Sequence, residues 1–147
     1  MCFSQAADIL ATGIVAGAFA IGTFALHPAA ARLEPPQHIL LRQELIRRLS
    51  RFLPPFMLLP LVTAPVAMMF CRLAGSWPSD MLGLALSFAT VAITVTTNAP
   101  LNRRFAKWSP TALPTDWHRD IRRWNRAHTL RMTTAVGAFA SAILAGR

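Results

Sequence analysis

The chain has 147 residues, of which 54% are hydrophobic and 14% are charged. This composition is too apolar for a typical water-soluble domain, and the length fits a single domain. The net charge of +9 does not indicate nucleic-acid binding, because the cationic residues flank apolar runs, where long basic side chains reach lipid phosphates. We therefore expect one domain embedded in membrane lipid, with no nucleic-acid partner. The sequence leaves the oligomeric state open.

The first apolar run, about residues 5–26, is long enough to span a bilayer. No lysine or arginine precedes it, so we expect a retained helix and not a cleaved signal peptide. Gly13 and Gly17 form a G-x-x-x-G pattern, which lets a second helix approach closely. Three prolines are expected to stop the helix after this run: Pro28, Pro35 and Pro36.

The second apolar run, about residues 52–70, follows an amphipathic segment over residues 39–53. That segment either lies along the inner membrane interface or extends the second span inward. We expect Pro54 and Pro55 to begin the helix of the span, because the first turn of a helix tolerates proline. Two later prolines should bend it, namely Pro60 and Pro65.

The third span, about residues 81–99, carries a polar stripe at three- and four-residue spacing: Ser87, Thr90, Thr94 and Asn98. In lipid such a stripe should face other helices. We expect Pro100 to break or kink the helix between Asn98 and Asn102.

The last helix is expected from near Asp116 to about Ala145, with a fourth span over about residues 124–145. Because the helix is longer than a span, its first turns should project into the cytoplasm. One helix face runs from aromatic to cationic to small apolar residues: Trp117, Ile121, Trp124, His128, Arg131, Ala135 and Phe139.

Nearly all the positive charge lies between the first and second runs and between the third run and the body of the fourth. These residues are Arg32, Arg42, Arg47, Arg48, Arg51, Arg103, Arg104, Lys107, Arg119, Arg122, Arg123, Arg126 and Arg131. Cationic loops stay on the cytoplasmic side of a membrane. We therefore expect an all-α, integral membrane four-helix bundle in the inner (plasma) membrane, with both termini outside and both basic loops cytoplasmic.

Cys2 and Cys71 are the only cysteines. The expected topology puts both near the outer face, where an oxidising compartment permits a disulfide. Spacing does not show the proximity that a disulfide needs, so two unrelated apolar residues are the favoured interpretation. No C-x-x-C occurs, and we predict no metal site.

Polar side chains gather at the inner ends of three spans: His27, Asn98, Asn102, Trp124, His128 and Arg131. Polar groups at that depth are costly unless they are paired or functional, so we expect them to line a pocket open to the cytoplasm. Arg131 needs a carboxylate, a carbonyl or a ligand oxygen as its partner. The absence of acidic residues from the centre of any span argues against a proton-coupled pump.

These residues carry a resemblance to a known family. The chain resembles the four-span bacterial membrane proteins that are grouped with the fungal anthrone oxygenases. The matching motifs are His27-Pro28, Asn98-Ala-Pro-Leu-Asn102 and the run Trp117…Arg123-Trp124…His128…Arg131. The resemblance covers most of the chain, and it implies insertion of O₂-derived oxygen into an aromatic small-molecule substrate, a polycyclic phenol, without a metal or flavin cofactor.

Such chemistry needs a base, a group that stabilises an oxyanion, and an apolar pocket lined by aromatic residues. The base would be His128, which we favour, or His27. The residues that stabilise the enolate would be Asn98, Asn102 and Arg131, and the residues that stack on the substrate rings would be Trp117 and Trp124.

Two other functions stay open at this stage. One is a binding or assembly protein in which the polar cluster only locks the helices together. The other is a haem or copper protein with His27 and His128 as opposed ligands. The metal interpretation is the weaker one, because two lone histidines without further ligands are common by chance.

Overall fold

The computed structural model describes residues 2–70 and 77–146. Within these residues the chain is helical throughout, with turns between the helices and one isolated bridge between Ser109 and Ala112. The pairing of Cys2 with Cys71 lies outside the described residues, because Cys71 is not one of them.

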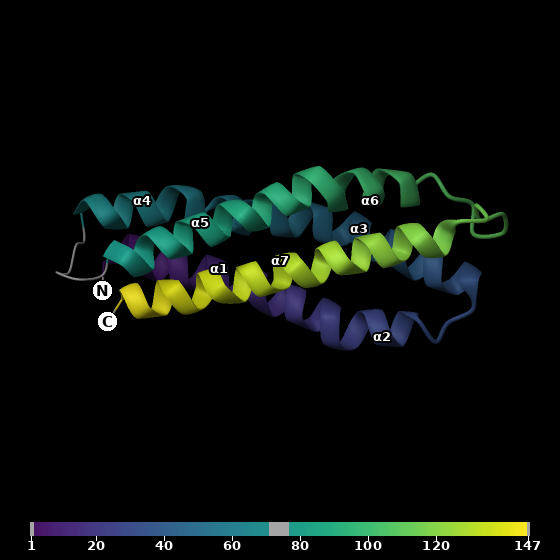
Figure 1. Ribbon diagram of the computed structural model, residues 1–147, viewed down its shortest axis with the longest axis horizontal. Helices are drawn as coiled ribbons and strands as arrows, with labels where there is room; N and C mark the ends of the chain where they lie inside the picture. The colour runs from purple at the N-terminus through teal and green to yellow at the C-terminus, as the bar shows by residue number, and fades with distance from the viewer. Residues whose placement is uncertain (1, 71–76, 147) are drawn as a thin grey trace.

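Residues 2–70 and 77–146 form four long helical segments laid side by side (Figure 1). The first comprises α1 (Phe3–Ile21), the π-helical turn η1 (Gly22–Leu26) and α2 (His27–Ala30). The second comprises α3 (Pro35–Leu58) and α4 (Pro60–Phe70). The third comprises α5 (Trp77–Ile93), the π-helical turn η2 (Thr94–Asn98) and α6 (Ala99–Phe105), and the fourth is α7 (Trp117–Ala145). Both termini lie at one end of the molecule, and the connections α2–α3 and α6–α7 lie at the other.

Among the described residues, three helical stretches are long and apolar enough to cross a membrane: Phe3–Ala30, Pro35–Phe70 and Trp77–Phe105. Helix α7 is not among them, because arginines fill its first turns and His128 and Arg131 enter its apolar part. The outer surface carries large apolar side chains, such as Phe24 at 73% and Phe88 at 65% exposure, which water would disfavour. The protein is therefore an all-helical membrane protein.

The first and third segments each contain one widened turn just before a proline. The N–H of the residue before each proline bonds to a carbonyl five residues back, His27 to Gly22 and Ala99 to Thr94. Proline lacks an N–H and crowds the carbonyl four residues back, and a local π-helical turn lets a membrane helix accommodate it. The prediction that Pro28 stops the helix is wrong, because α2 continues through it.

Helix α3 begins earlier than predicted. Its first turn holds Pro35-Pro36, where no intrahelical N–H is required, after an extended Glu34 with ψ 148°. The helix then continues through Pro54-Pro55, so the prediction that these residues begin a helix is wrong. The amphipathic residues before them have already formed it. The helix is interrupted at the residue before Pro60, where α4 starts.

The polar stripe of the third segment faces α7, as predicted. Ser87, Thr90 and Asn98 are buried, and the hydroxyl oxygens of Thr90 and Thr134 lie 2.7 Å apart. Hydroxyl pairs of this kind satisfy polar groups between helices in lipid.

Only one glycine of the G-x-x-x-G pattern is needed for close packing. A Cβ on Gly13 would lie 3.0 Å from Cε2 of Phe139 on α7, whereas a Cβ on Gly17 would meet nothing within 4 Å. The two positions share a helix and a residue type, but only Gly13 permits the approach of α7.

We predict that Gly13→Leu destabilises the protein and that Gly17→Leu does not. The leucine at position 13 must displace Phe139, and overpacking of this kind costs about 1–3 kcal/mol. Thermal unfolding in detergent should show a lower midpoint for Gly13→Leu only. Equal midpoints for the two variants would contradict the packing described for Gly13.

Candidate functional site

A cavity of about 320 Å³ lies among all four segments, toward the end of the molecule where α2 and α6 lie. Five residues that the sequence analysis selected line it: His27, Asn102, Trp124, His128 and Arg131. Arg42 lines it as well, and α3 supplies much of the apolar wall, through Leu41, Leu45, Ile46, Leu49, Leu53 and Met57. A cavity of this size and character is typical of small-molecule sites.

Trp124 is held rigidly in one wall. Its indole Nε1–H donates to Oδ1 of Asn102 at 2.7 Å, and its ring stacks on His128 with centroids 4.9 Å apart and planes 12° apart. Asn98 is fully buried and its Nδ2 lies 3.4 Å from the Trp124 carbonyl oxygen. Asn98 therefore supports the backbone of Trp124 and does not line the cavity.

Both ring nitrogens of His128 have partners. Nη2 of Arg131 lies 2.8 Å from Nδ1, and the carbonyl oxygen of Phe19 lies 3.2 Å from Nε2. Because a guanidinium only donates, Nδ1 must accept, and Nε2 carries the hydrogen that it donates to Phe19. We assign His128 as the neutral Nε2–H tautomer from this network. Its proton-accepting lone pair is covered by Arg131.

Gly22 makes the position of His128 possible. A Cβ on Gly22 would lie 2.6 Å from Nε2 of His128, closer than any real contact of this kind. Since Gly22 opens the π-helical turn η1, the widened turn and the absent side chain together admit the imidazole.

His27 differs from His128 in its hydrogen bonding. Its ring meets Trp124 and His128 edge-on, at centroid distances of 5.2 Å and 4.5 Å. Across residues 2–70 and 77–146, no hydrogen bond to the His27 ring is found, and the residue lines the cavity. Its imidazole nitrogens are thus open to a ligand.

Arg131 is buried at 7% exposure. Its Nη1 donates to Oγ1 of Thr94 at 3.4 Å, and its guanidinium carbon lies 4.3 Å from the centroid of the Phe19 ring. The sequence analysis expected a carboxylate, a carbonyl or a ligand oxygen as the partner of Arg131. Among the described residues its partners are instead a ring nitrogen and a hydroxyl.

Arg42 was not selected from the sequence. It is buried at 6% exposure, its Nη2 donates to Oδ1 of Asn125 at 3.2 Å, and its guanidinium carbon lies 4.6 Å from the Trp124 ring centroid. The signal was present in its spacing from Ile39 and Ile46, three and four residues away, which puts Arg42 on the apolar face of α3. The neighbouring Arg47 is exposed and pairs with Glu44.

Trp117 lies outside the cavity. Its ring packs against His118 at 3.8 Å and meets His38 edge-on at 5.8 Å, measured between ring centroids. The substrate-binding role predicted for Trp117 stays a prediction.

The loop end of the site is fastened by polar contacts. Gln43 donates from Nε2 to the carbonyl oxygens of Phe105 and Trp108 at 2.8 and 3.0 Å. Arg104 contacts the buried carboxylate of Asp120 at 3.0 Å. These contacts tie α3, α6 and α7 together beside the cavity.

The described residues contain no cluster of three or more His, Cys, Asp or Glu that could hold a metal ion. The donor set also fits a metal poorly at His128, because both of its nitrogens already have partners. The geometry therefore gives no support to the haem or copper interpretation.

Residues 43–141 match the family model described as anthrone oxygenase. The chain belongs to the anthrone oxygenase family. No curated protein and no solved structure matches it. The resemblance seen in the sequence motifs is thus confirmed. The part matched to the anthrone oxygenases includes the α6 and α7 walls of the cavity, whereas His27, Gly22 and Arg42 precede it.

We predict that Gly22→Ala displaces the His128 ring, because the added methyl would clash with Nε2 at 2.6 Å. Nitrogen NMR of ¹⁵N-histidine-labelled protein in detergent should show the Nε2–H tautomer of His128 in the wild type and a shifted signal in Gly22→Ala. Gly17→Ala is the matched control and should leave the signal in place. An unchanged signal in Gly22→Ala would refute the geometry given for His128.

Proposed function

We propose that this member of the anthrone oxygenase family catalyses cofactor-independent oxygenation of an anthrone-like polycyclic phenol. The observation that carries the proposal is an imidazole without a hydrogen-bond partner among the described residues, that of His27, in an apolar cavity beside Trp124 and Arg131. A base, a flat aromatic wall and a cation are the groups that this reaction requires.

The reaction begins with removal of a proton from the methylene group of the substrate. The resulting enolate passes one electron to O₂, and the substrate radical and superoxide combine into a peroxide anion at the same carbon. This anion takes the proton back from the base and becomes a hydroperoxide. Loss of water from the hydroperoxide converts that carbon into the second carbonyl of a quinone. One substrate and one O₂ thus give one quinone and one water.

His27 is a better candidate for the base than His128. The proton acceptor of His128 is already bonded to Arg131, so protonation there would put two cations in contact. His27 lines the same cavity with no such bond. We assign His128 instead to positioning Arg131 and stacking on Trp124. This assignment replaces His128, the base favoured on sequence alone. Activity measurements on His27→Ala and His128→Ala distinguish the two histidines.

The other groups act on the enolate and on the ring system. Arg131 would stabilise the developing oxyanion, and Asn102 would assist through its amide N–H, since its Oδ1 already accepts from Trp124. Trp124 would stack on the aromatic body of the substrate. Asn98 would act indirectly, through the backbone of Trp124.

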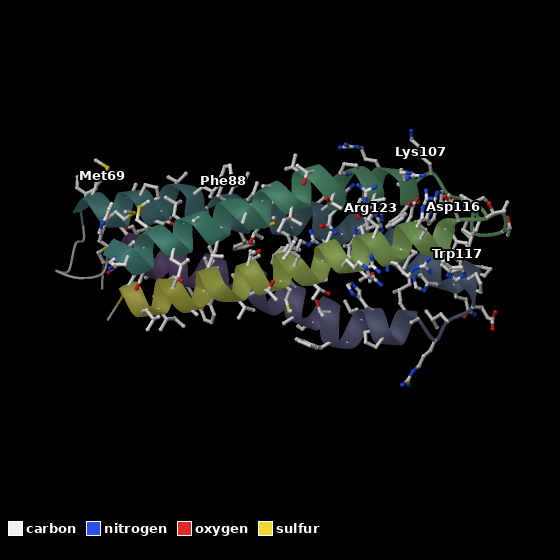
Figure 2. The ribbon with its side chains drawn as sticks, in the orientation of Figure 1. Met69, Phe88, Lys107, Asp116, Trp117 and Arg123 are labelled. Carbon is white, nitrogen blue, oxygen red and sulfur yellow. The ribbon has the colours of Figure 1, made fainter. Side chains whose placement is uncertain are left out.

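We further propose that α7 is a fourth span, over about residues 124–145. The helix has 29 residues, and at about 1.5 Å per residue it exceeds a hydrocarbon core of about 30 Å. Its arginine-rich first turns lie at the same end as Lys107 (Figure 2). By the positive-inside rule this end is cytoplasmic, which puts both termini outside the inner membrane, and α3 extends the second span inward.

We predict that a membrane-impermeant thiol reagent labels a cysteine at position 79 from outside intact cells but not one at position 109. Single Ser79→Cys and Ser109→Cys variants would be made with both native cysteines replaced by serine. Labelling of both after lysis is the control. The reverse pattern in intact cells would overturn the orientation.

We predict that His27→Ala lowers O₂ uptake with an anthrone by roughly a hundred- to ten-thousandfold, the usual cost of losing a well-placed base. The measurement uses purified protein in detergent and an oxygen electrode. His118→Ala, which changes an exposed histidine outside the cavity, is the matched control and should retain the wild-type rate.

If His27→Ala keeps full activity and His128→Ala is inactive, His128 is the base. No O₂ uptake by the wild type above the spontaneous rate, with any anthrone tested, would remove this substrate class. A binding or assembly role would then be favoured, since the hydroxyl pair of Thr90 and Thr134 already locks α5 to α7.

A further inference from the structure

Two arginines that line one cavity have no acidic partner among the described residues. Arg42 and Arg131 are both buried, and both border the cavity. The ion pairs found across the described part of the chain involve other basic residues, namely Arg47, Arg48, Arg104 and Arg119. A buried cation without an opposite charge is unfavourable, and binding of an anion in the cavity would offset this cost.

Arg42 makes fewer described hydrogen bonds than Arg131. Its described side-chain hydrogen bond is the one from Nη2 to Asn125, and its Nε is buried with no hydrogen-bond partner. Contacts with the faces of Trp124 and Phe105, at 4.6 and 5.5 Å from the ring centroids, compensate part of the charge. They leave the guanidinium donors available for an oxygen acceptor.

Both cations reach the same aromatic plane. The guanidinium carbons of Arg42 and Arg131 lie 4.6 and 5.4 Å from the ring centroid of Trp124. Arg42, Arg131 and Trp124 also line the same cavity, so both cations border the space that a ligand would fill. Arg131 already donates to His128 and Thr94, so the donors that remain for a second oxygen are those of Arg42.

The rest of the lining is apolar and comes largely from α3. Leu49 and Ser50 line the cavity and are also exposed, so the cavity opens there, just before the apolar second half of the segment. In the proposed orientation this opening lies near the inner membrane interface, where an amphiphilic molecule would reach it. The apolar wall favours a ligand with an apolar body, and the two arginines favour a ligand whose negative charge is confined to one group.

We propose that the cavity binds an amphiphilic anion, an oxyanion carried on a flat aromatic body, and that Arg42 is the residue that selects for its charge. The inference rests on the proposed function only in assigning the ligand to the same cavity. In the oxygenation, Arg131 serves the reacting oxygen and Arg42 holds a separate acidic group of the substrate.

Binding of a compound that cannot react tests this directly. Isothermal titration calorimetry in uncharged detergent would compare 9-anthracenecarboxylate with the neutral 9-anthracenemethanol, with blank titrations into empty micelles. The wild type should bind the anion at least tenfold more tightly. Arg42→Met should weaken binding of the anion by roughly ten- to a hundredfold, the usual worth of a hydrogen bond to a charged group. It should leave binding of the neutral compound unchanged.

Two further variants keep the result specific. Arg51→Met removes an exposed arginine from the same helix and should bind both compounds as the wild type does. Arg42→Lys retains the cation without the planar fork and should bind the anion more tightly than Arg42→Met.

The inference is overturned if the wild type does not distinguish the two compounds, or if Arg51→Met loses as much affinity for the anion as Arg42→Met. Displacement of the anion by added phosphatidylglycerol would also overturn it, because Arg42 would then serve a lipid headgroup. If the protein binds the anion but consumes no O₂, the proposed reaction is wrong and the inference about anion binding still holds.

Discussion

The contact between Arg131 and His128 organises the site. A buried guanidinium must place its donors, and it places them on Nδ1 of His128 and on Thr94. That choice fixes the tautomer of His128, which directs Nε2–H to the carbonyl of Phe19 and the ring face to Trp124. One cation thereby connects the first, third and fourth segments. It also leaves His27 as the histidine without a hydrogen-bond partner among the described residues of the cavity.

Prolines and widened turns position the groups around this contact. His27 follows η1, and Asn98 ends η2. In each case a π-helical turn precedes a proline and shifts the register of the residues after it. Gly22 opens the first of these turns and makes room for His128. The irregular backbone therefore lies next to the cavity, where it contributes to the shape of the site.

The sequence was most informative where periodicity decides the outcome. The polar stripe at Thr90 and the clustering of His27 with Trp124 followed from helical spacing and from depth in the membrane. The effect of Pro54-Pro55 could not be predicted in this way. Whether a helix ends at a proline or continues through it depends on whether the preceding residues already form a helix. Arg42 was grouped with solvated arginines although its spacing put it on the apolar face. The hydrogen bonds of His128 were beyond sequence reasoning, since the partner of Nε2 is the carbonyl of Phe19, which lies on another segment and far away in the sequence.

An experimental structure of the protein with a hydroxylated anthraquinone carboxylate, an unreactive relative of the expected product, would test the proposed site most directly. We expect the ligand to stack against Trp124 with its carboxylate on Arg42, and we expect Nδ1 or Nε2 of His27 to lie within hydrogen-bond distance of one of the two carbonyl groups of the central ring. A ligand bound elsewhere, or one with His27 turned away from it, would contradict the account.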